Sequence, residues 1–308
     1  MKFKQYSIAI LIILLACNGS LLKNKEQYVH KKPITSNENR RKVKDVNFLD
    51  DNLRRCFKGT EYILDVVSLE ASDRRIKKID GIENFIELFK IHFTENEIED
   101  ISPISTLKEL GILYLDNNNI TDLSPLHNLT GIKELYLENN DIFEVSHLGN
   151  LLYLENLYLK NNNISDISAL GNLHNLKILS LGSNQIKNIS SLNSLKKLRI
   201  LFIDNNKIED ITSISNLERI EVLYLNYNNF GDITPVSKLK KLKRLEIGYT
   251  DVVDLSPLYG LENLEKLYLG FNFFDEHPEE VEKFKNINPG CFIGPLERTS
   301  YIPSLSED

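Results

Sequence analysis

The chain has 308 residues, of which 42% are hydrophobic and 26% are charged, with a net charge of −7, three cysteines and no tryptophan. This composition is globular and excludes a disordered or collagen-like chain. The negative charge argues against nucleic acid as a partner, because binding to phosphates needs a basic surface. Three cysteines are too few for a disulfide framework.

The first sixteen residues have the pattern of an export signal. Lys2 and Lys4 precede the apolar run SIAILIILLA at residues 7–16, which has the length of a secretory hydrophobic segment and is too short to span a bilayer as a helix. The run ends Leu14-Leu15-Ala16-Cys17 and resembles the bacterial lipobox. This resemblance implies that residues 1–16 are a lipoprotein signal peptide and that Cys17 carries lipid. The alternative is a plain signal peptide followed by an incidental cysteine.

Residues 17–44 are polar and aperiodic, and we expect them to form a lipidated basic tether. Residues 18–44 carry eight Lys and Arg against two Glu, a charge of +6. Such a segment either lies against anionic lipid head groups or is simply solvated. With +2 on residues 1–16, the remaining residues 45–308 carry a charge of −15.

A repeat of 22 residues organises most of the chain. Ten rows begin at Ile63 and occupy residues 63–282, and residues 129–150 (LTGIKELYLENNDIFEVSHLGN) are a typical row. Apolar residues recur at row positions 1, 4, 7, 9, 14, 17 and 20, and Asn stands at position 12 in eight rows. A fixed period of this length indicates stacked structural repeats.

The spacing within a row predicts its local structure. Apolar positions 7 and 9 alternate with positions 6, 8 and 10, which is typical of a short strand with one buried face. A row cannot bury its apolar side chains alone, so neighbouring rows stack and their strands form a parallel sheet. The position-12 Asn is expected to bond backbone groups of adjoining turns. Asp-Ile-Ser-Pro at residues 100–103 favours a 3₁₀ turn on the outer side.

These rows resemble the leucine-rich repeats of bacterial internalins. The resemblance implies an α/β solenoid, that is, a leucine-rich-repeat arc with a parallel concave β-sheet and 3₁₀ or irregular segments on its convex side. Residues 45–62 resemble the helical N-terminal cap of internalins, with Leu49, Leu53, Cys56 and Phe57 on one helical face. We expect residues 283–308 to contain a C-terminal cap and a tail. A short helix from Pro278 is expected to place Val281 and Phe284 over the open end of the core.

The concave face is the candidate functional surface, formed by row positions 6, 8 and 10. Position 8 carries six aromatic residues, and aromatic side chains are enriched at binding hot spots. The residues expected to contact a partner are Tyr114, Tyr136, Tyr158, Ser180, Phe202, Tyr224 and Tyr268 at position 8, with Asp116, Glu138, Lys160 and Asp204 at position 10. Small Ser180 and Gly182 predict a shallow dent between Tyr158 and Phe202. The alternative is that the rings merely cover the sheet.

No arrangement of Ser, His, Asp or Cys suited to catalysis is apparent, and the histidines share no row position that would bind metal. We therefore expect a non-enzymatic protein-binding module without a cofactor. The charge of −15 predicts a protein partner with a basic patch, and the expected role is adhesion or host-protein interaction. We expect lipid anchoring in the bacterial envelope, at the outer membrane or cell surface. A periplasmic envelope scaffold and a glycan-binding surface protein are the alternatives.

Overall fold

The computed structural model describes residues 41–295. The chain separates into two units, Met1–Arg40 and Arg41–Asp308, and the described residues all belong to the second. The predicted signal peptide, Cys17, all of the tether before residue 41 and the end of the predicted tail lie outside the described residues. Within residues 41–295, no helix is both long enough and apolar enough to cross a membrane.

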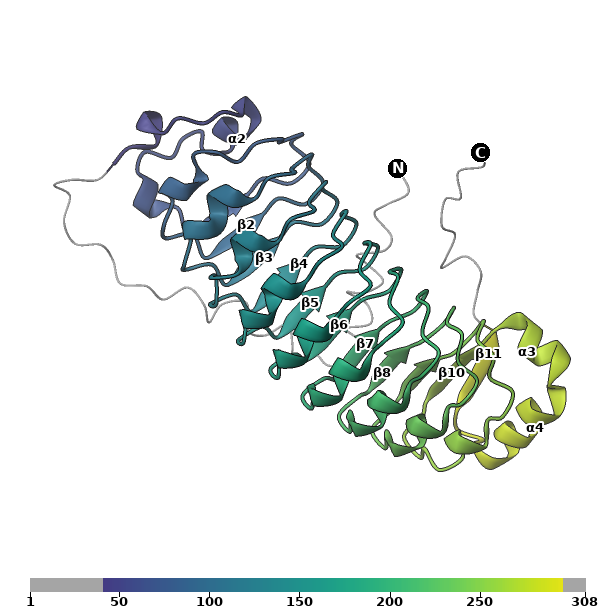
Figure 1. Ribbon diagram of the computed structural model, residues 1–308. Helices are drawn as coiled ribbons and strands as arrows, with labels where there is room; N and C mark the ends of the chain where they lie inside the picture. Colours follow the sequence, from purple (N-terminus) through teal and green to yellow (C-terminus); the bar gives the residue numbers. More distant parts are fainter. Residues whose placement is uncertain (1–40, 296–308) are drawn as a thin grey trace. The chain divides into compact units, whose positions relative to one another are not determined.

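The described residues contain one open sheet of eleven strands, which follow one another in chain order and are parallel to their neighbours (Figure 1). The strands are β1 Ser68–Glu70, β2 Lys90–His92, β3 Ile112–Tyr114, β4 Glu134–Tyr136, β5 Asn156–Tyr158, β6 Ile178–Ser180, β7 Ile200–Phe202, β8 Val222–Tyr224, β9 Arg244–Glu246, β10 Lys266–Leu269 and β11 Phe292–Pro295. From β1 to β10 each residue pairs with the residue 22 positions further along the chain, as Tyr114 does with Tyr136. Equal row positions therefore line up across the sheet, and the predicted leucine-rich-repeat solenoid is confirmed.

Among the described residues, nine short 3₁₀ helices connect successive strands from β1 to β10, and two more precede β1 (Figure 1). They are η1 Val43–Asp45, η2 Ile63–Asp65, η3 Ile82–Asn84, η4 Ser102–Thr106, η5 Ser124–Leu126, η6 Ser146–Asn150, η7 Ser168–Asn172, η8 Ser190–Ser194, η9 Thr212–Asn216, η10 Thr234–Lys238 and η11 Ser256–Leu258. Several of them start at an Asp-x-Ser or Asp-x-Thr sequence. In η4 the Ser102 amide donates to Asp100 Oδ1 at 2.7 Å, which satisfies an amide that the helix itself leaves unpaired.

The apolar row positions form one continuous core between the sheet and the 3₁₀ helices. In the row 129–150, the seven side chains at these positions are each at most 1% exposed. Burial of one such Leu or Ile side chain stabilises the fold by about 1.5–3 kcal/mol. The stack of rows, rather than any single row, therefore provides the stability of the solenoid.

The position-12 asparagines bond each row to the row before it. The Asn162 side chain donates to the carbonyls of Leu159 in its own row and Leu137 in the preceding row, at 3.1 and 2.9 Å, and accepts from the Ile142 amide at 3.0 Å. Equivalent contacts are made by Asn96, Asn118, Asn140, Asn184, Asn206 and Asn228. We call these seven residues the Asn ladder. They satisfy buried backbone groups, as predicted.

The N-terminal end is covered by helix α2 (Asp51–Cys56). Its N-cap is Asp50, whose carboxylate accepts from the amides of Asn52 and Leu53. Leu53 and Phe57 are buried as expected, but Leu49 is 56% exposed, so its predicted place on the packed face is wrong. The helix begins only at Asp51, and Phe48 instead packs on the Phe57 ring at 5.1 Å.

Two helices and one strand close the C-terminal end of the sheet: α3 Phe271–Glu276, α4 Pro278–Ile287 and β11. Helix α4 starts with Pro278 and buries Val281 and Phe284, as predicted. Strand β11 was not predicted. Lys266 of β10 pairs with Phe292, 26 residues further on, because the two helices lengthen this row by four residues. The 22-residue pattern therefore stops one strand before the sheet does.

Candidate functional site

Three tyrosines form a continuous stack across β3, β4 and β5. Tyr114 and Tyr136 have ring centroids 4.3 Å apart with 15° between their planes, and Tyr136 and Tyr158 are 4.6 Å apart with 7° between planes. His92 of β2 extends the stack at 4.6 Å from Tyr114. Because these residues are also partners in the strand register, the sheet holds the rings in place. The predicted convergence of position-8 side chains on one face is confirmed.

The aromatic column is interrupted at Ser180. Among the described residues, no ring contact joins Tyr158 to Phe202, and the aromatic contacts resume between Phe202 and Tyr224 at 4.7 Å. A Cβ atom added to Gly182 would lie 2.7 Å from Asp204 Oδ1. The Asp204 carboxylate therefore occupies the space above Gly182. The predicted dent is partly filled by a neighbouring side chain.

The accessible part of the aromatic column is smaller than the sequence predicted. Tyr158, Ser180 and Phe202 are only 3%, 1% and 6% exposed, and Asp204 is 8% exposed. Parallel stacking hides the face of each tyrosine ring behind the next, which the row pattern does not reveal. The half-buried rings at position 8 are those of Tyr114, Tyr136, Tyr224 and Tyr268. These four, rather than the whole column, are available for contact.

Carboxyl groups follow the tyrosine stack at position 10. The Glu138 amide donates to Asp116 Oδ1 at 2.7 Å, and Ser180 Oγ donates to Glu138 Oε1 at 2.9 Å. Burial, followed by the charge of Glu138, raises the pKa of Asp116 to about 8. Burial also raises the pKa of Glu138 and of Asp204, and the nearby charge of Lys160 opposes both increases. Lys160 thus acts on two of the three carboxyls, and a further cation beside them would favour their ionised form.

Arg244 on β9 forms a second feature of this face, which the sequence analysis missed. Its guanidinium lies 5.2 Å from the centroid of the Tyr224 ring and 4.6 Å from that of Tyr268, and its Nη2 atom lies 2.6 Å from Glu246 Oε1. Cation–π contacts of this kind stabilise a partly buried arginine. The sequence does contain a signal for this contact: Arg244 stands at row position 6, and the rows before and after it carry Tyr224 and Tyr268 at position 8.

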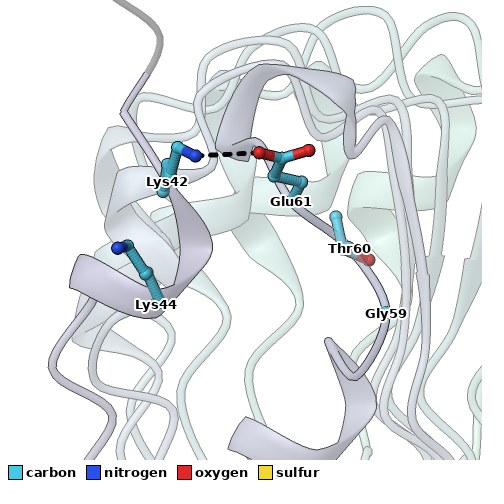
Figure 2. A pocket seen from close by; sticks show the side chains of 5 residues that line it. All are labelled: Lys42, Lys44, Gly59, Thr60 and Glu61. Carbon is cyan, nitrogen blue, oxygen red and sulfur yellow. Dashed lines mark hydrogen bonds and ion pairs between the residues drawn. The ribbon is translucent and has the colours of Figure 1, made fainter.

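Two cavities lie near the N-terminal end, away from the tyrosine stack. The smaller, of about 340 Å³, is lined by Lys42, Lys44, Gly59, Thr60 and Glu61, and Figure 2 shows the 2.8 Å ion pair between Lys42 and Glu61 that occupies its edge. The larger, of about 460 Å³, is lined by Asn52, Arg55, Cys56, Glu70, Asp73, Arg74 and Arg75. In the described part of the chain, no group of three or more His, Cys, Asp or Glu side chains is placed to hold a metal ion.

The repeat assignment is supported by a family model. The model described as "Leucine Rich repeats (2 copies)" matches residues 154–194 and 174–216. Together with the 22-residue rows and the sheet, this match identifies the fold as a leucine-rich-repeat solenoid, and its repeats are similar to those of internalins. No curated protein sequence matches the chain.

Solved structures extend this likeness. An internalin (InlF) from Listeria monocytogenes is 26% identical, with a TM-score of 0.51, and the match covers 85% of this chain and 95% of that one. A leucine-rich-repeat protein from Leptospira interrogans is 27% identical, with a TM-score of 0.65, over 71% of this chain and 57% of that one. The chain thus spans little more than half of the Leptospira protein.

A plant receptor shares the fold alone. The Arabidopsis receptor kinase HAESA, solved in complex with the peptide hormone IDA and the co-receptor SERK1, is 23% identical with a TM-score of 0.60, over 67% of this chain and 38% of that one. The leucine-rich-repeat fold is commonly a protein-binding module, and proteins of this kind are typically not enzymes.

Proposed function

We propose that this chain is a lipid-anchored bacterial surface protein that binds a partner protein through its concave face, in adhesion or host-protein interaction. The observation that carries the proposal is the stack of Tyr114, Tyr136 and Tyr158 on three neighbouring strands. The strands fix the rings before any partner arrives, so binding through them loses little conformational entropy. Tyrosine also combines a large apolar ring with a polar hydroxyl, as frequent hot-spot residues do.

The charges beside the stack define the partner's chemistry. Against the effect of burial, Lys160 acts to lower the pKa of Glu138 and of Asp204, whereas the neighbouring charge that acts on Asp116 is the Glu138 carboxylate. Residues 45–308 carry a charge of −15. A partner with exposed Lys or Arg would compensate these carboxyls and approach faster at low salt. We therefore propose a basic protein segment that lies along the position-10 side chains and places apolar surface on Tyr114 and Tyr136.

A capture experiment tests the proposal. Tyr114 and Tyr136 are changed together to Ala, and the exposed Phe143 and Tyr153 are changed to Ala in a matched control variant. Each protein is immobilised and exposed to membrane proteins of a candidate host cell, and captured proteins are cross-linked and mapped. One partner that cross-links to β3–β5, is retained by the control and is lost from the Tyr114/Tyr136 variant supports the proposal. Equal recovery by all three proteins contradicts it.

Surface display is a separate part of the proposal and needs its own test. Protease treatment of intact cells should cleave the protein if it lies on the cell surface. Protection until the cells are lysed would favour the envelope-scaffold alternative. A glycan array addresses the remaining alternative, because saturable glycan binding that is lost in Tyr136→Ala would indicate a sugar rather than a protein ligand.

A further inference from the structure

The larger cavity, of about 460 Å³, gathers three arginines at the N-terminal end of the sheet. Arg55 comes from the last turn of α2, and Arg74 and Arg75 come from the loop that follows β1. Their convergence is unusual in this molecule, because residues 45–308 carry a charge of −15. We call this feature the arginine cavity.

The three guanidinium groups have no carboxylate partner among residues 41–295. Elsewhere in this range Arg54 pairs with Asp51 at 3.2 Å, and Arg199 pairs with Glu221 at 2.6 Å. In the arginine cavity, Arg55 Nη1 donates to the neutral Asn52 Oδ1 at 3.0 Å, and no ion pair to Arg74 or Arg75 is present within the described residues. The positive charges of these three guanidinium groups are therefore not paired with any carboxylate in residues 41–295, and a bound anion could compensate them.

The acidic residues that line the cavity do not cancel this charge. The Glu70 carboxylate already binds Lys90 Nζ at 2.6 Å and His92 Nδ1 at 2.8 Å. Asp73 alone then opposes three arginines. The cavity retains a surplus of positive charge beside an otherwise acidic surface.

The backbone that presents Arg74 and Arg75 is held firmly. Asn96 Oδ1 accepts from the amides of Arg74 and Ile76, at 3.1 and 3.0 Å. Arg75 adopts a φ angle of 56°, in the left-handed region that non-glycine residues rarely occupy, whereas the φ of 54° at Asp73 recurs at the same position of later rows, as at Glu95 and Asn117. The hydrogen bonds to Asn96 therefore fix the backbone from which the Arg74 side chain extends.

The row pattern explains why an arginine can stand at this point. Arg74 occupies row position 12, where the Asn ladder begins one row later with Asn96. An asparagine in the first row would have no preceding row to bond, so the ladder gains nothing from it. Residue 74 therefore does not need to make the hydrogen bonds of the Asn ladder, and an arginine is compatible with the fold at this position.

We propose that the arginine cavity binds the phosphate group of a small phosphate monoester. Guanidinium groups match the oxygens of a phosphate with paired N–H donors and remain charged at any physiological pH. A cavity of about 460 Å³ falls within the size of small-molecule sites and exceeds what an inorganic phosphate fills. The site is independent of the concave-face proposal.

Calorimetric titration of the full chain at low salt tests this site with inorganic phosphate, glucose 6-phosphate and glucose. We expect saturable binding of both phosphates, tighter binding of glucose 6-phosphate and no binding of glucose. Arg74→Gln and Arg75→Gln should each weaken binding by about tenfold or more, as expected when one charge-assisted hydrogen bond is lost. Arg219→Gln, at an exposed arginine in another row, should leave binding unchanged.

Thermal unfolding provides a second readout that does not depend on heat signals. At the same concentration, phosphate should raise the melting temperature of the wild-type chain more than that of Arg74→Gln. Without ligand, the two melting temperatures should match, because Arg74 is exposed. Absence of saturable phosphate binding overturns the proposal, as does equal weakening by Arg219→Gln. Binding of glucose 6-phosphate no tighter than that of inorganic phosphate overturns the assignment to a monoester.

Discussion

Tyr136 and Tyr158 lie face to face, with ring centroids 4.6 Å apart and planes 7° from parallel. The distance is close to the spacing of adjacent β-strands, so the sheet itself sets the stack. Tyr158 is 3% exposed, whereas Tyr136 is half-buried. The two rings therefore have different roles: the buried Tyr158 ring packs against Tyr136, and the half-buried Tyr136 ring is accessible to a partner.

This difference yields a first prediction. Tyr136→Ala should weaken the affinity for the captured partner by about 1.5–3 kcal/mol, in the range of hot-spot residues. It should also lower the free energy of unfolding by about 1–3 kcal/mol, because the ring stacks on both Tyr114 and Tyr158. Calorimetry with the purified partner and urea unfolding measure the two effects. Tyr153→Ala, at a residue 64% exposed, is the control. If Tyr153→Ala weakens binding as much as Tyr136→Ala, the concave site is contradicted.

The Asn ladder gives a second prediction. Asn162→Ala removes two donors and one acceptor from the buried carbonyls of Leu137 and Leu159 and the amide of Ile142. Leaving these groups unpaired should lower the free energy of unfolding by about 2–4 kcal/mol. Urea unfolding followed by circular dichroism measures the loss.

The ninth row allows the opposite change. Thr250 stands at the ladder position there, and its hydroxyl donates only to the Ile247 carbonyl at 2.8 Å. Thr250→Asn restores the side chain of the other rows and should raise the free energy of unfolding by about 1 kcal/mol. A decrease would show that the last rows before α3 have lost the ladder geometry.

Asp50 gives a prediction about pH. Burial alone would raise the pKa of its carboxyl, but hydrogen bonds from the amides of Lys77, Leu53, Asn52 and Lys78 outweigh burial and lower it. A lowered native pKa means that the stabilisation is present above the unfolded-state value near 4 and is lost as pH falls through the native value. Asn caps a helix about as well as Asp does, so the effect of Asp50→Asn comes from the lost charge on hydrogen bonds from four amides. We expect a destabilisation of about 1 kcal/mol at pH 7 and much less at pH 2. Equal destabilisation at both pH values would contradict the role of the carboxylate charge.

The position-10 carboxyls give a pH dependence of the other sign. The pKa of Asp116 is raised to about 8, first by burial and then by Glu138, so this carboxyl favours the native state below pH 4 and the benefit is lost as pH rises through 8. Binding of a basic partner should strengthen over the same range, because Asp116 becomes charged. Affinities measured at pH 6 and pH 9 test this, and Asp116→Asn should flatten the difference.

The solenoid fold follows from the amino-acid pattern alone. Its period of 22 places the same side chains at the same depth in every row, as at Leu135, Leu157 and Leu179, which are all fully buried. Burial of such positions requires the rows to stack, and stacking brings Tyr114, Tyr136 and Tyr158 to one face. The family resemblance rested on the same residues, which is why the fold followed from local pattern alone.

Features that depend on contacts outside the 22-residue period could be seen only in three dimensions. Strand β11 forms because it pairs with the edge of β10. Its residues lie 26 positions after their partners in β10, four more than the 22-residue row. The Asp204 carboxylate fills the space above Gly182, and Arg55 joins Arg74 and Arg75 across the junction of cap and first row. The 22-residue repeat predicts contacts between equivalent positions of neighbouring rows. Contacts between non-equivalent positions depend on how the side chains and the terminal segments pack in three dimensions.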